Sequence, residues 1–86
     1  MTTQIVKHKN GLTSLEFEED DISAVRATIV DLFGNASQTK YVVASDVRFG
    51  GESFTFQNKW DDPCLISSTE QGGEYLQRIH ATLKAR

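Results

Sequence analysis

The sequence of 86 residues is poor in the features that mark secreted, membrane-spanning or low-complexity proteins. Cys64 is the single cysteine, so no disulfide can form within the chain, which fits a reducing compartment. One proline and six glycines leave no linker-like segment. The apolar runs are short, and the polar N-terminus lacks the basic and apolar stretches of a secretory signal. We therefore expect a cytoplasmic protein that does not associate with membranes.

Positive charge is also scarce. Nine Lys and Arg residues stand against twelve Asp and Glu residues, which gives a formal net charge of −3 at pH 7. The basic residues are scattered, with small concentrations only at Lys7 to Lys9 and at the C-terminus. Because phosphate repels an acidic chain and no basic stripe opposes that repulsion, the composition argues against nucleic-acid binding.

The length and composition are those of one small globular domain, residues 1–86. A hydrophobic fraction of 38% and a charged fraction of 24% are ordinary for a chain with a packed core. At this length the core must be shared between one sheet and a couple of helices.

The clearest pattern lies between Lys40 and Trp60, where two alternating strands flank Gly50-Gly51. Glycines can take the positive φ angles of a tight hairpin turn. Counting outward from the turn pairs Val47 with Phe54, Ser45 with Phe56, Val43 with Asn58 and Tyr41 with Trp60. This register predicts an apolar inner face, because a slip of one residue would mix the two faces. The predicted core residues of this hairpin are Tyr41, Val43, Val47, Phe54, Phe56 and Trp60.

A second hairpin is expected from residues 3–8 and 12–18, which flank Lys9-Asn10-Gly11. A two-residue Asn-Gly turn would pair Val6 with Leu15. A three-residue loop with Gly11 in the left-handed conformation would instead place Ile5, Leu15 and Phe17 on one face. We favour the three-residue loop, because it buries more apolar surface on one side.

A helix is predicted over residues 22–33, because Ile22, Val25, Ile29, Leu32 and Phe33 follow a helical period. Gly34-Asn35 provides its C-terminal stop. The acidic residues before it are Glu16, Glu18, Glu19, Asp20 and Asp21. We interpret the run as helix capping by Asp20 or Asp21 rather than as a cation site or an acidic docking patch, since the ligand spacing of a calcium loop is absent.

The remaining segments are shorter. Residues 35–39 are expected to be a polar connection into the central hairpin, Asp61-Asp62-Pro63 a turn, and residues 64–67 a short strand. Ser68 with Gln71 has the spacing of a capping box, and Thr69 is a competing N-cap. Because Gly72-Gly73 weakens a first turn, the last helix is expected to begin only after it. An apolar stripe follows, made of Tyr75, Leu76, Ile79, His80 and Leu83.

The predicted element order is ββαβββα. Two helices with single apolar stripes most simply cover one face of a mainly antiparallel sheet, which gives an α+β two-layer sandwich. The opposite face of the sheet would then stay open to solvent.

No motif for catalysis, metal binding or cofactor binding is present, which argues against an enzyme. His8 and His80 lie in different elements, and neither has the spacing of a zinc site. Cys64 follows a proline in a predicted strand, where cysteine usually behaves as a small hydrophobe. Asp61 and Asp62 are adjacent, so in an extended segment they would point to opposite sides.

We expect a small, acidic, non-enzymatic protein-interaction module, of the adaptor, immunity-protein or antitoxin kind, or one that associates with itself as a homodimer. The predicted partner surface is the polar outer face of the central hairpin, whose mixed charges suit a protein partner. Its residues are Asp46, Arg48, Thr55, Gln57 and Lys59. The same face would also be explained by ordinary solvation of one side of a sheet.

The alternative is a small-ligand or anion-binding protein, or an enzyme subunit, that uses the loop from Ser67 to Gly73. Free N–H groups and the helix dipole would favour an anion there. The candidate anion site is Ser68, Thr69, Gly72 and Gly73, with Cys64 and Asp61 or Asp62 nearby. A deep pocket bounded by these residues would favour this alternative.

Overall fold

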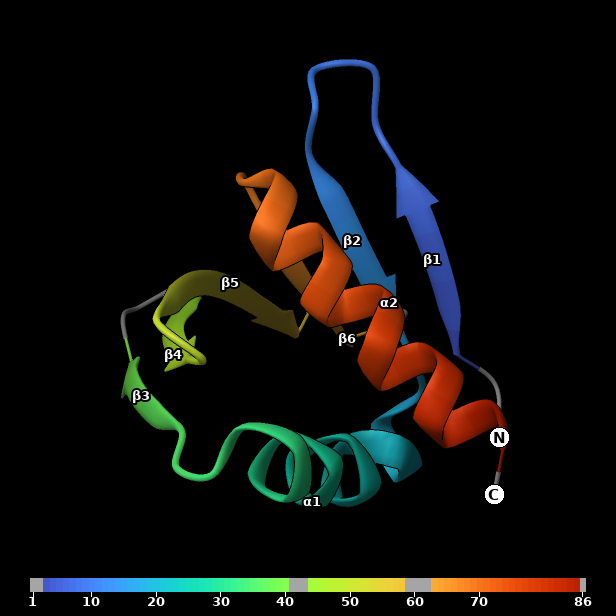
Figure 1. Cartoon of the computed structure of the whole chain (residues 1–86), viewed down its shortest axis with the longest axis vertical. Helices are drawn as coiled ribbons and strands as arrows, with labels where there is room; N and C mark the ends of the chain where they lie inside the picture. The colour runs from blue at the N-terminus through green and yellow to red at the C-terminus, as the bar shows by residue number, and fades with distance from the viewer. Residues whose placement is uncertain (1–2, 41–43, 59–62, 86) are drawn as a thin grey trace.

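The computed structural model of the chain describes residues 3–40, 44–58 and 63–85. Its element order is ββαββββα, with a short 3-10 helix, η1, before the first α-helix (Figure 1). The elements are β1 (Gln4–Lys7), β2 (Thr13–Glu16), η1 (Glu19–Asp21), α1 (Ile22–Phe33), β3 (Ser37–Lys40), β4 (Ser45–Phe49), β5 (Glu52–Asn58), β6 (Pro63–Ser67) and α2 (Glu70–Lys84).

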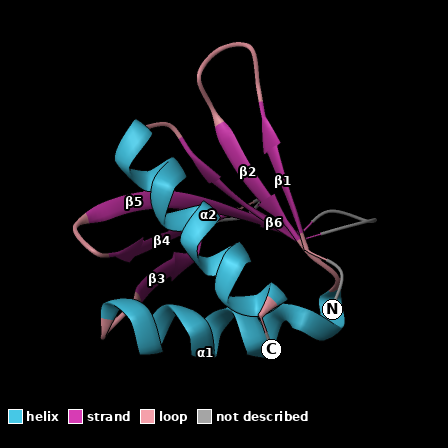
Figure 2. Ribbon diagram, turned by 45° about the vertical axis from the view of Figure 1, so that its right-hand side comes forward, coloured by secondary structure: helices cyan, strands magenta, loops and turns pink. Residues whose placement is uncertain are grey.

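The six strands form one sheet in the order β1-β2-β6-β5-β4-β3, and every neighbouring pair is antiparallel. Both helices lie on the same side of this sheet (Figure 2). The α+β sandwich predicted from the sequence is therefore confirmed. Among the described residues, no helix is long and apolar enough to cross a membrane.

The sheet has one strand more than the sequence predicts. Residues 35–39 were expected to be a polar connection, but Ser37 to Lys40 form β3, which pairs with β4 through Ser37 and Arg48 at one end and Lys40 and Ser45 at the other. β3 contains no apolar residue, and an edge strand can be held by its backbone ladder alone. The hydrophobic pattern that reveals the other strands is therefore missing from it.

The central hairpin has the predicted register. Val47 pairs with Phe54 and Ser45 with Phe56. Gly50 has φ +60°, and a Cβ there would lie 2.7 Å from the Tyr75 ring, so the turn needs glycine for both conformation and space. Of the predicted core residues, Phe54 is buried and Val47 and Phe56 are partly buried, whereas Tyr41, Val43 and Trp60 lie outside the described residues.

The first hairpin has the three-residue loop. Ile5 pairs with Leu15, and the N–H of His8 donates to the carbonyl of Leu12 at 2.8 Å. Gly11 has φ +86° and donates its N–H to the carbonyl of His8 at 3.2 Å. This loop puts Leu15 in the core, as expected from the apolar face it creates.

The first long helix, α1, has the predicted bounds and ends where the N–H of Gly34 donates to the carbonyl of Val30 at 2.9 Å. The predicted capping of α1 by Asp20 or Asp21 is not present: Asp21 occupies the N-cap position, but with φ −90° and ψ −5° its backbone is not in the extended conformation of a side-chain cap, and its side chain accepts no cap hydrogen bond there. The Asp21 carboxylate instead accepts the N–H of Glu18 at 3.4 Å, within the 3-10 turn that leads into α1.

The last helix begins earlier than expected. α2 starts at Glu70, with Thr69 as its N-cap, and the Thr69 hydroxyl accepts the N–H of Gly72 at 3.0 Å. Thr69, rather than the Ser68 and Gln71 pair, is therefore the cap. The glycines lie inside the first turn because the helix approaches the sheet closely there: a Cβ at Gly72 would be 2.1 Å from the Ser67 hydroxyl oxygen, and a Cβ at Gly73 would be 3.0 Å from that of Thr13.

The two helices cover the sheet unequally. α2 contacts β1, β2, β5 and β6, whereas α1 packs mainly against α2. The core follows α2 and consists of Leu15, Phe17, Val25, Ile29, Phe49, Phe54, Leu65, Leu76, Ile79 and Leu83. We call β1, β2 and β6 the α2-covered half of the sheet, and β3 and β4 the α1-facing half, with β5, which α2 also contacts, between them.

Candidate binding cleft

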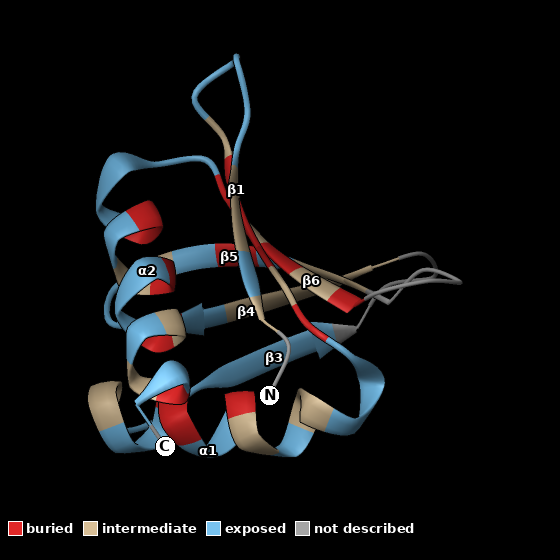
Figure 3. Cartoon of the chain, turned by 90° about the vertical axis from the view of Figure 1, so that its right-hand side faces the viewer, coloured by how far each residue is buried: buried red, intermediate tan, exposed pale blue. Residues whose placement is uncertain are grey.

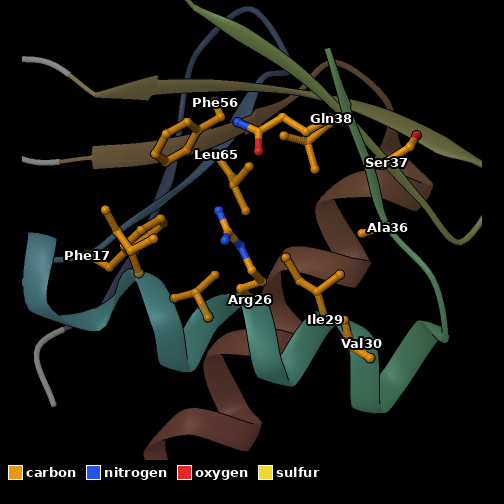
Figure 4. Close-up of a pocket in the computed structure, with 12 residues that line it drawn as sticks. Phe17, Arg26, Ile29, Val30, Ala36, Ser37, Gln38, Phe56 and Leu65 are labelled. Carbon is orange, nitrogen blue, oxygen red and sulfur yellow. The ribbon is translucent and has the colours of Figure 1, made fainter. Parts of the chain in front are cut away.

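A cleft of about 180 Å³ opens between α1 and the inner face of the sheet (Figure 4). Residues of α1 form one wall, residues of β3 to β6 with the chain just before β3 form the other, and Phe17, which follows β2, also contributes. The lining residues are Phe17, Ile22, Val25, Arg26, Ile29, Val30, Ala36, Ser37, Gln38, Val47, Phe56 and Leu65.

The sheet side of the cleft is formed by side chains from four strands. Phe56 pairs with Leu65 and Val47 pairs with Gln38, so the lining passes from large apolar residues on β6 and β5 to a smaller one on β4 and a polar one on β3. A valine and a glutamine fill less of the space beneath α1 with apolar atoms than a leucine and a phenylalanine do.

The helix side is formed by the middle of α1, where Val25 and Ile29 belong to the buried core and also line the cleft. At the C-terminal end of α1, the Phe33 ring lies 4.7 Å from that of Tyr75 on α2 and 5.0 Å from that of Phe49 on β4, measured between centroids. The guanidinium of Arg78 lies 5.8 Å above the same ring. These aromatic contacts hold the C-terminal turn of α1 against α2 and β4.

The α1 wall combines apolar side chains with one cation. Val30 is the one large apolar side chain in the described part of the chain that is exposed, at 47% of its surface. Arg26 extends from α1 toward Leu65 and Gln38 on the sheet (Figure 4). Within residues 3–40, 44–58 and 63–85 it has no hydrogen-bond or ion-pair partner. Its guanidinium therefore has five donors that remain available in an otherwise apolar wall.

The strand β3 provides a free edge beside the cleft. It is the last strand of the sheet, and Ser37, Gln38 and Thr39 are exposed (Figure 3). In an antiparallel edge strand, alternate residues direct their N–H and C=O groups away from the neighbouring strand. Ser37 and Gln38 also line the cleft, so the edge and the cleft are one continuous feature.

The predicted partner face is present on the other side of the sheet. Asp46 pairs with Thr55 across the strands, and Arg48 donates to Asp46 at 3.0 Å, where the two side chains are 69% and 26% exposed. The Ser53 hydroxyl also donates to Asp46, at 3.4 Å. Thr55 is exposed and Gln57 is half-buried, whereas Lys59 lies outside the described residues. The two described charges on this face therefore pair with each other.

The predicted anion site has its donors in use. The N–H of Gly72 donates to the Thr69 hydroxyl, and the N–H of Gly73 donates to the Thr69 carbonyl at 3.0 Å. Both glycines are buried, and Ser68 is exposed. The Thr69 hydroxyl donates to the carboxylate of Glu52, which places a negative charge where an anion would bind.

The described residues of the alternative site lie away from the cleft. No residue from Ser67 to Gly73 lines the cleft, and Asp61 and Asp62 lie outside the described residues. Cys64 is half-buried on β6, opposite Gln57 in the register.

The two histidines bind hydroxyl groups. The Nδ1 atom of His80 lies 2.7 Å from the Thr3 hydroxyl, and the Nε2 atom of His8 lies 2.8 Å from that of Ser14. In the part of the chain that the structure describes, no cluster of three or more His, Cys, Asp or Glu side chains could hold a metal ion.

The sequence contained two weak signals of the cleft. Val30 is an apolar residue outside the stripe of α1, and Arg26 follows the buried Val25 directly. Either residue taken alone is ordinary on a helix surface. Their meaning depends on β3, which the hydrophobic pattern did not reveal.

Comparisons of the chain with protein-family models, with curated proteins and with solved structures found no match. The geometry of the cleft and of the β3 edge is therefore the basis on which a function can be proposed.

Proposed function

We propose that this chain is a non-enzymatic protein-interaction module, which binds an extended segment of a partner protein along the free edge of β3. One apolar side chain of that segment occupies the cleft beneath α1. The observation that supports this proposal is that Ser37 and Gln38 belong to both the free edge and the cleft wall. A strand added to a sheet edge gains main-chain hydrogen bonds, and a pocket beside the edge selects its side chains.

The volume of the cleft supports a single side chain as its occupant. Pockets for drug-sized ligands and cofactors measure about 300–1,000 Å³. An apolar cavity of about 150 Å³ accommodates one benzene ring. At about 180 Å³, the cleft has room for one leucine-sized or phenylalanine-sized group.

The alternative, a small-ligand or anion-binding protein or an enzyme subunit using the loop from Ser67 to Gly73, has less support. The N–H groups of both glycines are engaged within α2, and Glu52 would repel an anion. The outer face with Asp46 and Arg48 is a second surface on which a partner could bind, but its described charges already neutralise one another. The single cysteine fits a cytoplasmic location for the module.

The test is selection of random decapeptides displayed on phage against the whole chain, followed by affinity measurements on variants. Ala36→Phe places a ring at the cleft, where Ala36 forms part of the lining. Ala81→Phe is the matched control, because Ala81 is exposed on α2 and does not line the cleft. Burying one apolar side chain contributes about 1.5–3 kcal/mol, so Ala36→Phe should weaken binding about ten- to hundredfold and the control should not.

Hydrogen exchange locates the bound peptide. Binding should slow exchange of the amides of β3, because its outward N–H groups acquire partners. Selected peptides that bind the Ala36→Phe variant unchanged, or that protect another element and leave β3 unaffected, would contradict the proposal. So would failure of the selection to enrich any peptide.

A further inference from the structure

We infer that the partner segment carries an acidic side chain, which binds the Arg26 guanidinium, two residues away from the apolar side chain that fills the cleft. This inference rests on the proposed function and specifies the chemistry of the partner. It starts from the charges at the cleft: among the described residues that line it, Arg26 is the only charged one.

The environment of Arg26 favours an anionic partner. Arg26 is exposed, and its side chain extends from α1 toward Leu65 (Figure 4). It has no ion-pair partner among the described residues. A bound segment would displace water from the cleft, and a cation left there without a partner would lose hydration with no compensation. A carboxylate compensates for the lost hydration by accepting two parallel N–H···O bonds from the planar guanidinium.

No described acidic group forms an ion pair with Arg26. The carboxylate of Asp21 accepts the N–H of Glu18, and that of Asp46 binds Arg48 on the opposite face of the sheet. The acidic residues before α1 would repel a partner segment that carries a long run of acidic residues. The charge distribution therefore favours one carboxylate beside an apolar side chain, rather than an acidic run.

The sheet geometry sets the spacing. In a strand added to β3, residues two apart point to the same face and lie about 6.6–6.8 Å apart along the strand. Gln38 points into the cleft from the inner face of β3, as Figure 4 shows. An apolar and an acidic residue separated by one position would therefore both face the cleft. If the apolar and the acidic residue were adjacent in the segment, one of the two would face the outer side of the sheet.

The test uses four fluorescein-labelled peptides with amidated C-termini on a threonine framework. The central residues are Phe-Thr-Glu in the first and Phe-Thr-Gln in the second. The third has Phe-Glu-Thr, which moves the acid to the opposite face, and the fourth has Ala-Thr-Glu. Fluorescence anisotropy measures their binding to the wild-type chain, to Arg26→Gln and to Lys84→Gln. The last variant is the matched control, because it removes one positive charge at an exposed position of α2.

The Phe-Thr-Glu peptide should bind the wild-type chain about five- to tenfold more tightly than the Phe-Thr-Gln and Phe-Glu-Thr peptides. This preference should disappear in Arg26→Gln and persist in Lys84→Gln. Equal binding of the three Phe peptides, or a preference that survives Arg26→Gln, would overturn the inference while leaving the proposed function intact. A Phe-Thr-Glu peptide that bound more tightly with a free C-terminus would also overturn it, because a terminal carboxylate would then be the group that Arg26 recognises.

The peptide without phenylalanine distinguishes failure of the proposed function from failure of the inference about the acidic side chain. If the Phe-Thr-Glu and Ala-Thr-Glu peptides bind equally, or if none of the four peptides binds at millimolar concentration, the cleft does not take an apolar side chain and the proposed function itself fails.

Discussion

The strands are antiparallel in both halves of the sheet, but a helix covers the two halves differently. Over the α2-covered half, Gly72 and Gly73 let the helix backbone approach Ser67 and Thr13 closely. Over the α1-facing half, the helix is held near its end by Phe33 and leaves a cleft of about 180 Å³. Under the proposed function, the space left beneath α1 is where the side chain of a partner would bind.

The comparison is tested most strongly by removing one apolar side chain from each helix. Leu76→Ala in α2 should lower the free energy of unfolding by about 2–5 kcal/mol, because Leu76 is fully buried. Val30→Ala in α1 should change it by less than about 0.5 kcal/mol, because Val30 is exposed at the cleft. Urea denaturation followed by circular dichroism measures both. Similar losses in the two variants would show that Val30 also belongs to the stabilising core.

The close approach of α2 can be tested at its first turn. Gly72→Ala should destabilise the domain by about 1–3 kcal/mol despite the better helix propensity of alanine, because the new Cβ would overlap the Ser67 hydroxyl. Removing that hydroxyl in a Gly72→Ala and Ser67→Ala double variant should recover part of the loss. A double variant whose loss equals the sum of the two single losses would show that the contact with Ser67 is not the cause.

Filling the cleft should improve stability at the expense of binding. Gln38→Leu adds an apolar side chain to the cleft wall, so we expect a gain of about 0.5–1 kcal/mol in the free energy of unfolding and weaker binding of the selected peptides. Thr39→Leu is the control, because Thr39 pairs with Asp46 on the outer face of the same strand. Peptide binding that weakens equally in both variants would show that the edge, and not the cleft, selects the partner.

The smallest effect is expected on the outer face. Arg48→Glu combined with Lys59→Glu should change stability by no more than about 1 kcal/mol, since the pair of Arg48 with Asp46 is exposed. Binding of the selected peptides, measured by anisotropy, should be unchanged. If this double variant lost the peptides and Ala36→Phe retained them, the partner surface would be the outer face that the sequence first indicated.

Much of the fold could be read from local patterns, and the reason differs from element to element. The register of β4 and β5 followed from the alternation around Gly50-Gly51, because a slip would have exposed Phe54. The loop at Gly11 followed from the apolar face of β1 and β2. The bounds of α1 followed from its periodicity and from Gly34. Each of these features depends on residues that are near neighbours in the chain.

The tertiary structure decided the features that depend on distant residues. β3 has no hydrophobic pattern, so its existence depends on the backbone of β4. The start of α2 at Glu70 depends on the space that Ser67 and Thr13 leave for two glycines. The cleft depends on where α1 comes to rest, which Phe33, Tyr75 and Phe49 set together. By itself, the sequence determined the α+β architecture and the faces of its hairpins, because burial of one face gives each strand or helix a regular spacing of apolar residues. Packing between distant elements determined where α1 leaves a cleft against the sheet. The spacing of apolar residues within a single element does not reveal such a cleft.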